Sequence, residues 1–114
     1  MKSEIILSFT KIVISTEFLG DDILITVSGG DKPHIGTAVL AVPRPSLTGD
    51  GNVSATSSVL NVTGHKDEDI CRILAEKASK KYGVTVVCIG GFHIDHISAE
   101  QIKEVVSAIR NFDL

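Results

Sequence analysis

The feature that most constrains the fold is a change of hydrophobic period between Val62 and Asp67. Before this point, apolar and β-branched residues alternate or form short runs, which is typical of strands. After it, Ile70, Leu74 and Ala78 recur at the spacing of one helix face. A chain that forms several strands first and helices later is expected to fold as an α+β domain.

Four segments before this change have the character of strands and are separated by turn-forming residues: 4–18, 23–28, 36–42 and 53–62. We expect the first two to form a hairpin around Gly20-Asp21-Asp22. The stretch 43–52 is rich in Pro, Gly and Asp, and it predicts an exposed loop. The last strand contains many Ser and Thr residues and is expected to be partly exposed.

The second half predicts a helix, a strand and a second helix. Gly83 is placed to end the first helix as its C′ residue, and the apolar run 84–89 that follows predicts a central strand. Ser98 and Gln101 have the spacing of a capping box, which starts a helix that runs to about Asn111. The predicted order is ββββ-α-β-α, a mostly antiparallel sheet with two helices packed on one face, in a single domain of residues 1–114.

Composition excludes several classes of protein. The 114 residues are 43% hydrophobic and carry a formal charge of −3, with the basic residues scattered along the chain, so nucleic acid is not an expected partner. No apolar run is long enough to span a membrane, and no signal peptide is recognisable, which predicts a cytoplasmic protein. Cys71 and Cys88 lack a metal-binding spacing and are expected to be buried, inert thiols.

The histidines indicate where function lies. All four are in segments bracketed by Gly or Pro, which we expect to be loops: PHIG at 33–36, GHKDE at 64–68 and GGFHIDH at 90–96. Two of these segments lead into helices, whose free N–H groups and positive dipole end can bind a phosphate. The pairs Gly29-Gly30 and Gly90-Gly91 would allow the backbone to approach a ligand closely.

Other interpretations of the same residues remain open. His34, His65 and His93 could bind a metal if their loops meet, with Asp67, Asp95 or His96 as a fourth ligand, which would suit a small metal-dependent hydrolase. None of the usual ligand spacings is present, so metal is not our first expectation. Each histidine could instead bond a backbone carbonyl, the acids at 67 and 68 could be ordinary first-turn helix residues, or the loops could form an assembly surface.

Three motifs carry a resemblance to a known family. They are Gly29-Gly30-x-x-Pro33-His34-Ile35-Gly36, then His65-Lys66-Asp67, then Gly91-x-His93 followed by Ile97-Ser98 and Gln101-Ile102. In this order, over about residues 22–102, they resemble the LpdD-like proteins, small D subunits of gallate and related phenolic-acid decarboxylases. That family is regarded as chaperones or carriers of prenylated FMN.

The resemblance implies an accessory protein rather than an enzyme. It would bind prenylated FMN, or FMN, made by a UbiX-type prenyltransferase, and supply it to a UbiD-type decarboxylase, and we expect a homo-oligomer. Carried over by position, the cofactor-binding residues are Gly29, Gly30, Pro33, His34, Gly36, His65, Lys66, Asp67, Gly91 and His93. Phe92 is the one nearby ring that could cover the flavin, and an apolar pocket could serve instead. His96 departs from the family pattern.

Overall fold

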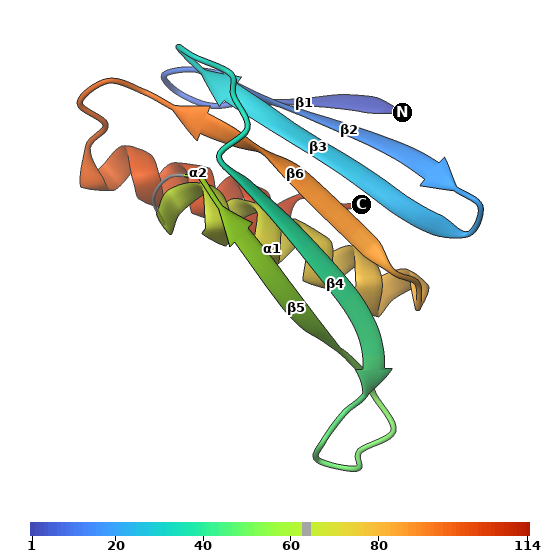
Figure 1. The fold of residues 1–114 in the computed structure, drawn as a ribbon. Helices are drawn as coiled ribbons and strands as arrows, with labels where there is room; N and C mark the ends of the chain where they lie inside the picture. The colour runs from blue at the N-terminus through green and yellow to red at the C-terminus, as the bar shows by residue number, and fades with distance from the viewer. Residues whose placement is uncertain (63–64) are drawn as a thin grey trace.

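The computed structural model describes residues 1–62 and 65–114, with the side chains of His65 and Lys66 outside the description. Six strands and two helices follow the order β1 (Lys2–Ile6), β2 (Lys11–Leu19), β3 (Asp22–Gly30), β4 (Thr37–Pro45), β5 (Val53–Asn61), α1 (His65–Tyr82), β6 (Val86–His93) and α2 (Ala99–Asn111). The strands form one sheet, and both helices cover the same face of it (Figure 1). The predicted fold class is therefore confirmed.

Strand β6 is inserted in the middle of the sheet. The order across the sheet is β1-β2-β3-β6-β4-β5, so β6 separates two strands that precede it in the chain. It pairs in parallel with β3 and antiparallel with β4, whereas all other neighbours are antiparallel. The prediction of a central strand, which was made from the continuous apolar run, is therefore confirmed.

The core lies between the sheet and the helices. Alternate residues of β2, β3, β4 and β6 point to the helices, which contribute the apolar faces of α1 and α2. Its largest fully buried side chains include Ile12, Ile14, Ile25, Leu74 and Ile109. Among the described residues, no helix is both long enough and apolar enough to cross a membrane.

The helix boundaries follow the local signals. Gly83 has a φ of +65° and donates its N–H to the Ser79 carbonyl at 2.9 Å, which closes the end of α1 as predicted. At α2, the Ser98 Oγ accepts from Gln101 N–H, and the Gln101 side chain accepts from Ser98 N–H. The predicted capping box is therefore confirmed.

The strands extend further than the sequence predicted. The segment 4–18 divides into β1 and β2 at a turn, and Pro43–Pro45, expected in the loop, continue β4. Gly29-Gly30 end β3, and the stretch from Gly90 to His93, expected in a loop, ends β6. The prediction was wrong here because the paired neighbours hold these glycines in the sheet despite their low strand propensity.

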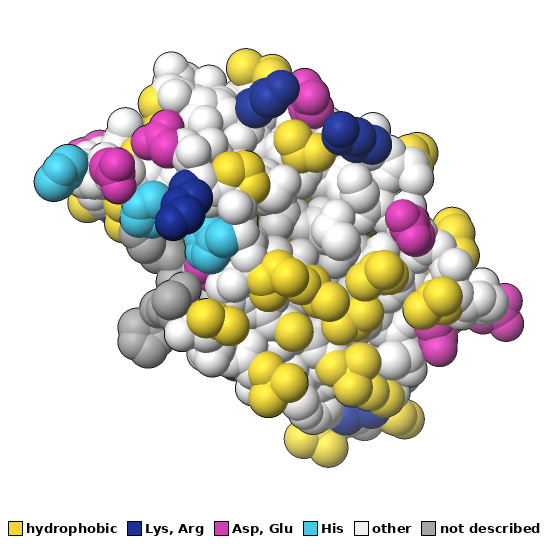
Figure 2. Space-filling view, turned by 45° about the horizontal axis from the view of Figure 1, so that its top comes forward, with side chains coloured by type: hydrophobic (Ala, Val, Ile, Leu, Met, Phe, Trp, Pro, Cys, Tyr) yellow, Lys and Arg dark blue, Asp and Glu magenta, His cyan; other side chains and the backbone are white. Residues whose placement is uncertain are grey.

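The face of the sheet opposite the helices carries an apolar patch. Its members alternate with the core residues along β3, β4, β5 and β6: Leu24, Ala38, Leu40, Val42, Leu60, Val87 and Ile89. Registered rows of this apolar sheet patch run across the strands, for example Leu24, Val87 and Leu40. Figure 2 shows the hydrophobic side chains gathered on this face, with histidines to one side of them.

Candidate functional site

His34 is held between a loop carbonyl and a helix carboxylate. Its Nδ1 lies 3.0 Å from the Lys32 carbonyl oxygen, and its Nε2 lies 3.2 Å from Oδ2 of Asp67. Its side chain is 28% exposed and that of Asp67 is 7% exposed, so the ring is fixed yet still reachable from solvent. The carbonyl can only accept, so Nδ1 is the donor in that contact, and Asp67 faces the other ring nitrogen.

Asp67 closes a gap in the sheet. The β4–β6 ladder begins at the pair Thr37–Gly90, preceded by a hydrogen bond from Gly36 N–H to the Gly90 carbonyl. The next amide of β6 that faces the β4 side is that of Phe92, which lies beyond the end of β4. It donates its N–H to Oδ1 of Asp67 at 2.8 Å instead. A buried amide without a partner is costly, so this carboxylate supports the fold as well as the position of His34.

Two of the predicted glycines leave room for this arrangement. A Cβ at Gly91 would lie 2.9 Å from both Cε1 and Nε2 of His34, so the imidazole packs directly on the backbone of β6. A Cβ at Gly36 would collide with Oδ2 of Asp67. Both positions require glycine because the His34–Asp67 pair occupies the space where a side chain would be.

The other predicted glycine pair joins β3 to β6. A Cβ at Gly29 would lie 2.7 Å from the Lys11 carbonyl oxygen and 2.9 Å from the Phe92 ring. Gly30 has a φ of +78°, and a Cβ there would collide with the His93 carbonyl oxygen. That carbonyl also accepts from Asp31 N–H at 2.7 Å. These glycines therefore bring the 31–36 segment close to the end of β6.

His93 is the second imidazole of the site. It is the last residue of β6, and its Nε2 lies 2.8 Å from Oδ1 of Asp95. The rings of His34 and His93 meet edge to face, with centroids 6.4 Å apart. His93 is exposed, which leaves it open to a ligand beside the more buried His34.

The structure thus brings most of the predicted residues together, but not as three loops. His34, Gly36, Asp67, Gly91 and His93 form one cluster, with Gly29 and Gly30 adjoining it through β6. Pro33 is exposed within the 31–36 segment. His65 and Lys66 begin α1 immediately before Asp67, and their side chains lie outside the described ones.

Two predictions about single side chains fare differently. Phe92 cannot cover a flavin, because it is 4% exposed and its ring packs in the core against Phe9, with centroids 6.4 Å apart. That prediction was wrong because Phe92 points to the helix face of the strand that carries His93. His96 lies in the turn before α2 with a φ of 57°. It is not among the described contacts of His34 or His93.

Sequence reasoning missed the apolar surface next to the histidines. Along the sheet, the row Thr26, Ile89 and Ala38 is followed by Ser28 and Gly91, and then by Gly30 and His93. On the uncovered face, apolar side chains are therefore followed within a few residues by the histidine side chains (Figure 2). The signal was present in Thr37–Val42, where apolar residues point to both faces although helices cover only one.

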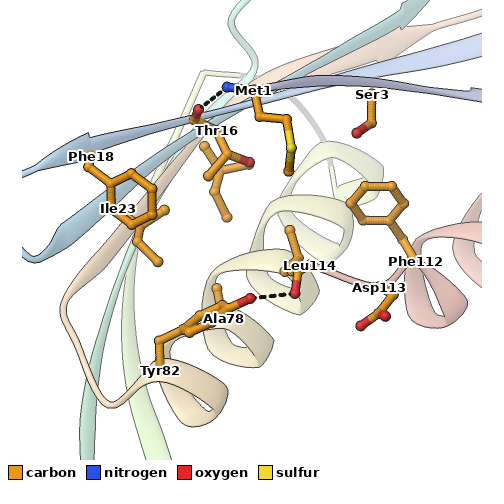
Figure 3. Close-up of a pocket in the computed structure, with 11 residues that line it drawn as sticks. Met1, Ser3, Thr16, Phe18, Ile23, Ala78, Tyr82, Phe112, Asp113 and Leu114 are labelled. Atoms are coloured by element: carbon orange, nitrogen blue, oxygen red, sulfur yellow. Dashed lines mark hydrogen bonds between the residues drawn. The ribbon is translucent and has the colours of Figure 1, made fainter.

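A separate apolar cavity of about 230 Å³ lies at the opposite end of β3. Figure 3 shows Phe18, Ile23 and Phe112 around it, with the Tyr82 hydroxyl bonded to the Leu114 carbonyl oxygen at 2.5 Å. None of the residues that line it belongs to the histidine cluster. The cavity offers apolar contacts but no imidazole, so it and the cluster are distinct places.

The cluster has few of the properties of a metal centre. Within residues 1–62 and the described side chains from Asp67 onward, no three His, Cys, Asp or Glu side chains converge as metal ligands do. Both ring nitrogens of His34 already face oxygen atoms of the protein. The described donors suit hydrogen bonding to an organic or phosphate-bearing ligand.

Comparison with known proteins gives a family and a distant likeness. A chain in the crystal structure of a chaperone complex for yeast 20S proteasome assembly matches with a TM-score of 0.46 and 14% identity, over 94% of this chain and 82% of that one. This likeness is too distant to bear on function. No curated protein matches the sequence.

The family assignment rests on the sequence. The family model described as the prenylated flavin chaperone LpdD-like domain matches residues 8–112. The match covers nearly the whole chain and contains every residue of the cluster. The protein therefore belongs to the prenylated flavin chaperone LpdD-like family.

Proposed function

We propose that this protein binds prenylated FMN at the His34–His93 cluster without transforming it, and supplies it to a UbiD-type decarboxylase. The cofactor would come from a UbiX-type prenyltransferase. Membership of the family supports the choice of ligand. The cluster supports its place, because it is where the matched motifs meet.

The observation that carries this proposal is that two imidazoles lie beside an uncovered apolar surface of the sheet (Figure 2). Prenylated FMN has a planar ring system with an apolar added ring, polar ring edges and a phosphate. The apolar sheet patch can bury the flat face, and the exposed His93 can bond the polar edge beside the His34 ring, whose two nitrogens are already engaged. The donor set of the site therefore fits the cofactor.

The phosphate needs positive groups at the polar end. His93 is exposed, and Lys32, whose carbonyl holds the His34 ring, is exposed beside it. The first turn of α1 adds backbone N–H groups at the same end of the sheet, next to Asp67. We place the phosphate nearest Lys32, because the Asp67 carboxylate lies at the His34 ring and the Asp95 carboxylate lies at the His93 ring, and either would repel it.

Binding without catalysis agrees with the state of His34. A general base needs a free nitrogen within reach of the proton that it removes. Both nitrogens of this ring are engaged, with Lys32 and Asp67, so its role is to hold an orientation. The proposal is therefore a carrier that presents the cofactor unchanged.

Titration of the purified protein with FMN and with prenylated FMN tests the binding step. We expect changes in flavin absorbance and an increase in melting temperature, since a ligand that binds only the folded state stabilises it. The variant His93→Ala should weaken binding by about tenfold, equivalent to the loss of roughly 1.4 kcal/mol of contacts. Phe18→Ala, which removes an exposed ring from the lining of the separate cavity, is the matched control and should bind as the original does.

The result that contradicts binding at the cluster is equal affinity of the His93→Ala variant and the original protein. Loss of binding in Phe18→Ala alone would move the site to the separate cavity. Elemental analysis of the same preparation tests the alternative of a metal-dependent hydrolase, which requires stoichiometric metal.

The supply step needs its own experiment. The loaded protein is mixed with a UbiD-type decarboxylase that lacks cofactor, and decarboxylation is followed against free prenylated FMN at the same concentration. We expect faster activation by the loaded protein than by the free cofactor. Equal rates would reduce the role to storage and would leave the binding result unchanged.

A further inference from the structure

The two edges of the sheet differ in a way that indicates a partner. Strand β5 forms one edge and pairs only with β4, and β1 forms the other and pairs only with β2 (Figure 1). An exposed strand edge presents unpaired backbone groups that can bind another strand, so proteins usually protect it.

Two hydrogen bonds that flank β5 show which backbone groups face outward. Val62 N–H donates to Gly36 at 2.7 Å, and Ser46 N–H donates to the Asn52 carbonyl at 2.9 Å. In an antiparallel pair, every second residue bonds its neighbour, so even-numbered residues of β5 bond β4. The odd-numbered residues direct N–H and C=O groups to the free edge: Val53, Ala55, Ser57, Val59 and Asn61.

Strand β5 lacks the usual protection of an edge. Its nine residues, VSATSSVLN, contain no charged residue and no proline. Among the described residues, no hydrogen bond reaches the outward backbone groups of its odd-numbered positions. By contrast, β1 has five residues, carries Lys2 and Glu4, and has an ion pair between Glu4 and Lys11 at 3.3 Å.

We propose that two copies of this chain associate by antiparallel pairing of their β5 strands about a two-fold axis. The result is one continuous sheet of two times six strands. An uncharged strand is complementary to itself, because antiparallel pairing with its copy sets no like charges opposite each other. The apolar sheet patches, which reach β5 at Leu60, then lie on the same face of the combined sheet.

This pairing also brings a loop of each copy to the cluster of the other. In this pairing, the start of β5 at Val53 faces the end of the partner's β5. That end lies next to Gly36 of its own chain, because Val62 N–H donates to the Gly36 carbonyl oxygen. The 46–52 loop of one copy therefore extends alongside the region of Gly36 and α1 of the other. Leu47 in this loop is 88% exposed in the single chain, so the loop has apolar surface available there.

Proline substitution at an outward amide tests the pairing selectively. Ala55→Pro removes a donor that faces the free edge and leaves the bonds to β4 in place. We expect the original chain to have twice the 12.1 kDa mass of one chain by light scattering and native mass spectrometry, and the variant to have that of a single chain. The control is Glu4→Pro, which removes an outward amide on the β1 edge and should leave the dimer intact.

A monomeric original chain at micromolar concentration would overturn the proposal, as would a dimer that withstands Ala55→Pro but not Glu4→Pro. If Ala55→Pro fails to fold, hydrogen exchange of the original chain decides instead. The amides of Ala55, Ser57 and Val59 should become protected as the concentration rises, and unchanged exchange would contradict the pairing. Neither measurement uses flavin, so failure here is distinct from failure of the proposed function.

Discussion

Asp67 and His34 lie 33 residues apart in the chain and meet through Oδ2 and Nε2 at 3.2 Å. The other oxygen of the same carboxylate accepts the buried N–H of Phe92. One side chain from α1 therefore fixes both a strand of the sheet and the imidazole of the candidate site. Stability and the orientation of the His34 ring are linked through this residue, and substitutions can separate the two effects.

Replacing Asp67 by Ala should destabilise the protein by about 1–3 kcal/mol, because the Phe92 amide is left buried without an acceptor. Asp67→Asn should cost less, since its side-chain oxygen can still accept from that amide. Urea unfolding measures both. Asp69→Ala, at an exposed position of the same helix turn, is the control, and an equal loss in this control would contradict the assigned role.

Gly91→Ala should displace the His34 ring, because the added Cβ would lie 2.9 Å from the ring and from the His34 carbonyl oxygen. We expect shifted His34 ring resonances in NMR spectra and flavin affinity reduced by about tenfold or more. Gly20→Ala is the control, since its Cβ meets no atom within 4 Å while its φ of +61° still strains an alanine. That variant should lose some stability and keep its affinity.

Acid should weaken the link between α2 and the turn that joins β1 to β2. The Ser8 hydroxyl and then the Ser8 N–H, at 2.6 and 2.7 Å from the Glu104 carboxylate, lower the pKa of Glu104. Its stabilising effect is thus complete above the ordinary Glu pKa of about 4.3, and is lost as the pH falls through the lower native pKa. The stability difference between the original chain and Glu104→Gln should therefore shrink between pH 6 and pH 3 in urea melts. A difference that grows in acid would contradict this sign.

The two cysteines should resist thiol reagents in the native protein. Both are buried, and a hydrogen bond with Cys71 together with burial raises the pKa of Cys88 well above its ordinary value. Since the thiolate is the reactive form, an aromatic disulfide reagent at pH 8 should release no product until urea is added. Ser107→Cys, at an exposed position, is the control and should react at once.

The fold could be predicted from the sequence where local signals decide the structure. The capping box at Ser98 and the C′ glycine at Gly83 act within a few residues, so their patterns are readable in one segment. The insertion of β6 between β3 and β4 could not be predicted in this way. It depends on contacts between segments that are more than 40 residues apart, which periodicity does not record.

The sequence predicted which residues of the candidate site lie close together better than it predicted the contacts between them. His34 and His93 do meet, but Asp67 looked like an ordinary first-turn acid because its tertiary partners lie in other elements. Gly91 looked like a loop residue for the same reason, since its need for a missing Cβ comes from a distant imidazole. Residues with purely tertiary roles leave no local pattern in one sequence.

The late position of β6 in the chain has a consequence for biosynthesis. During translation, β3 and β4 emerge long before the strand that joins them, so the five earlier strands cannot complete one sheet until residue 93 has left the ribosome. The same strand supplies Gly91 and His93 and the amide that Asp67 accepts. The finished sheet and the His34–His93 cluster therefore depend on the same late strand, and a nascent chain shorter than 93 residues has neither.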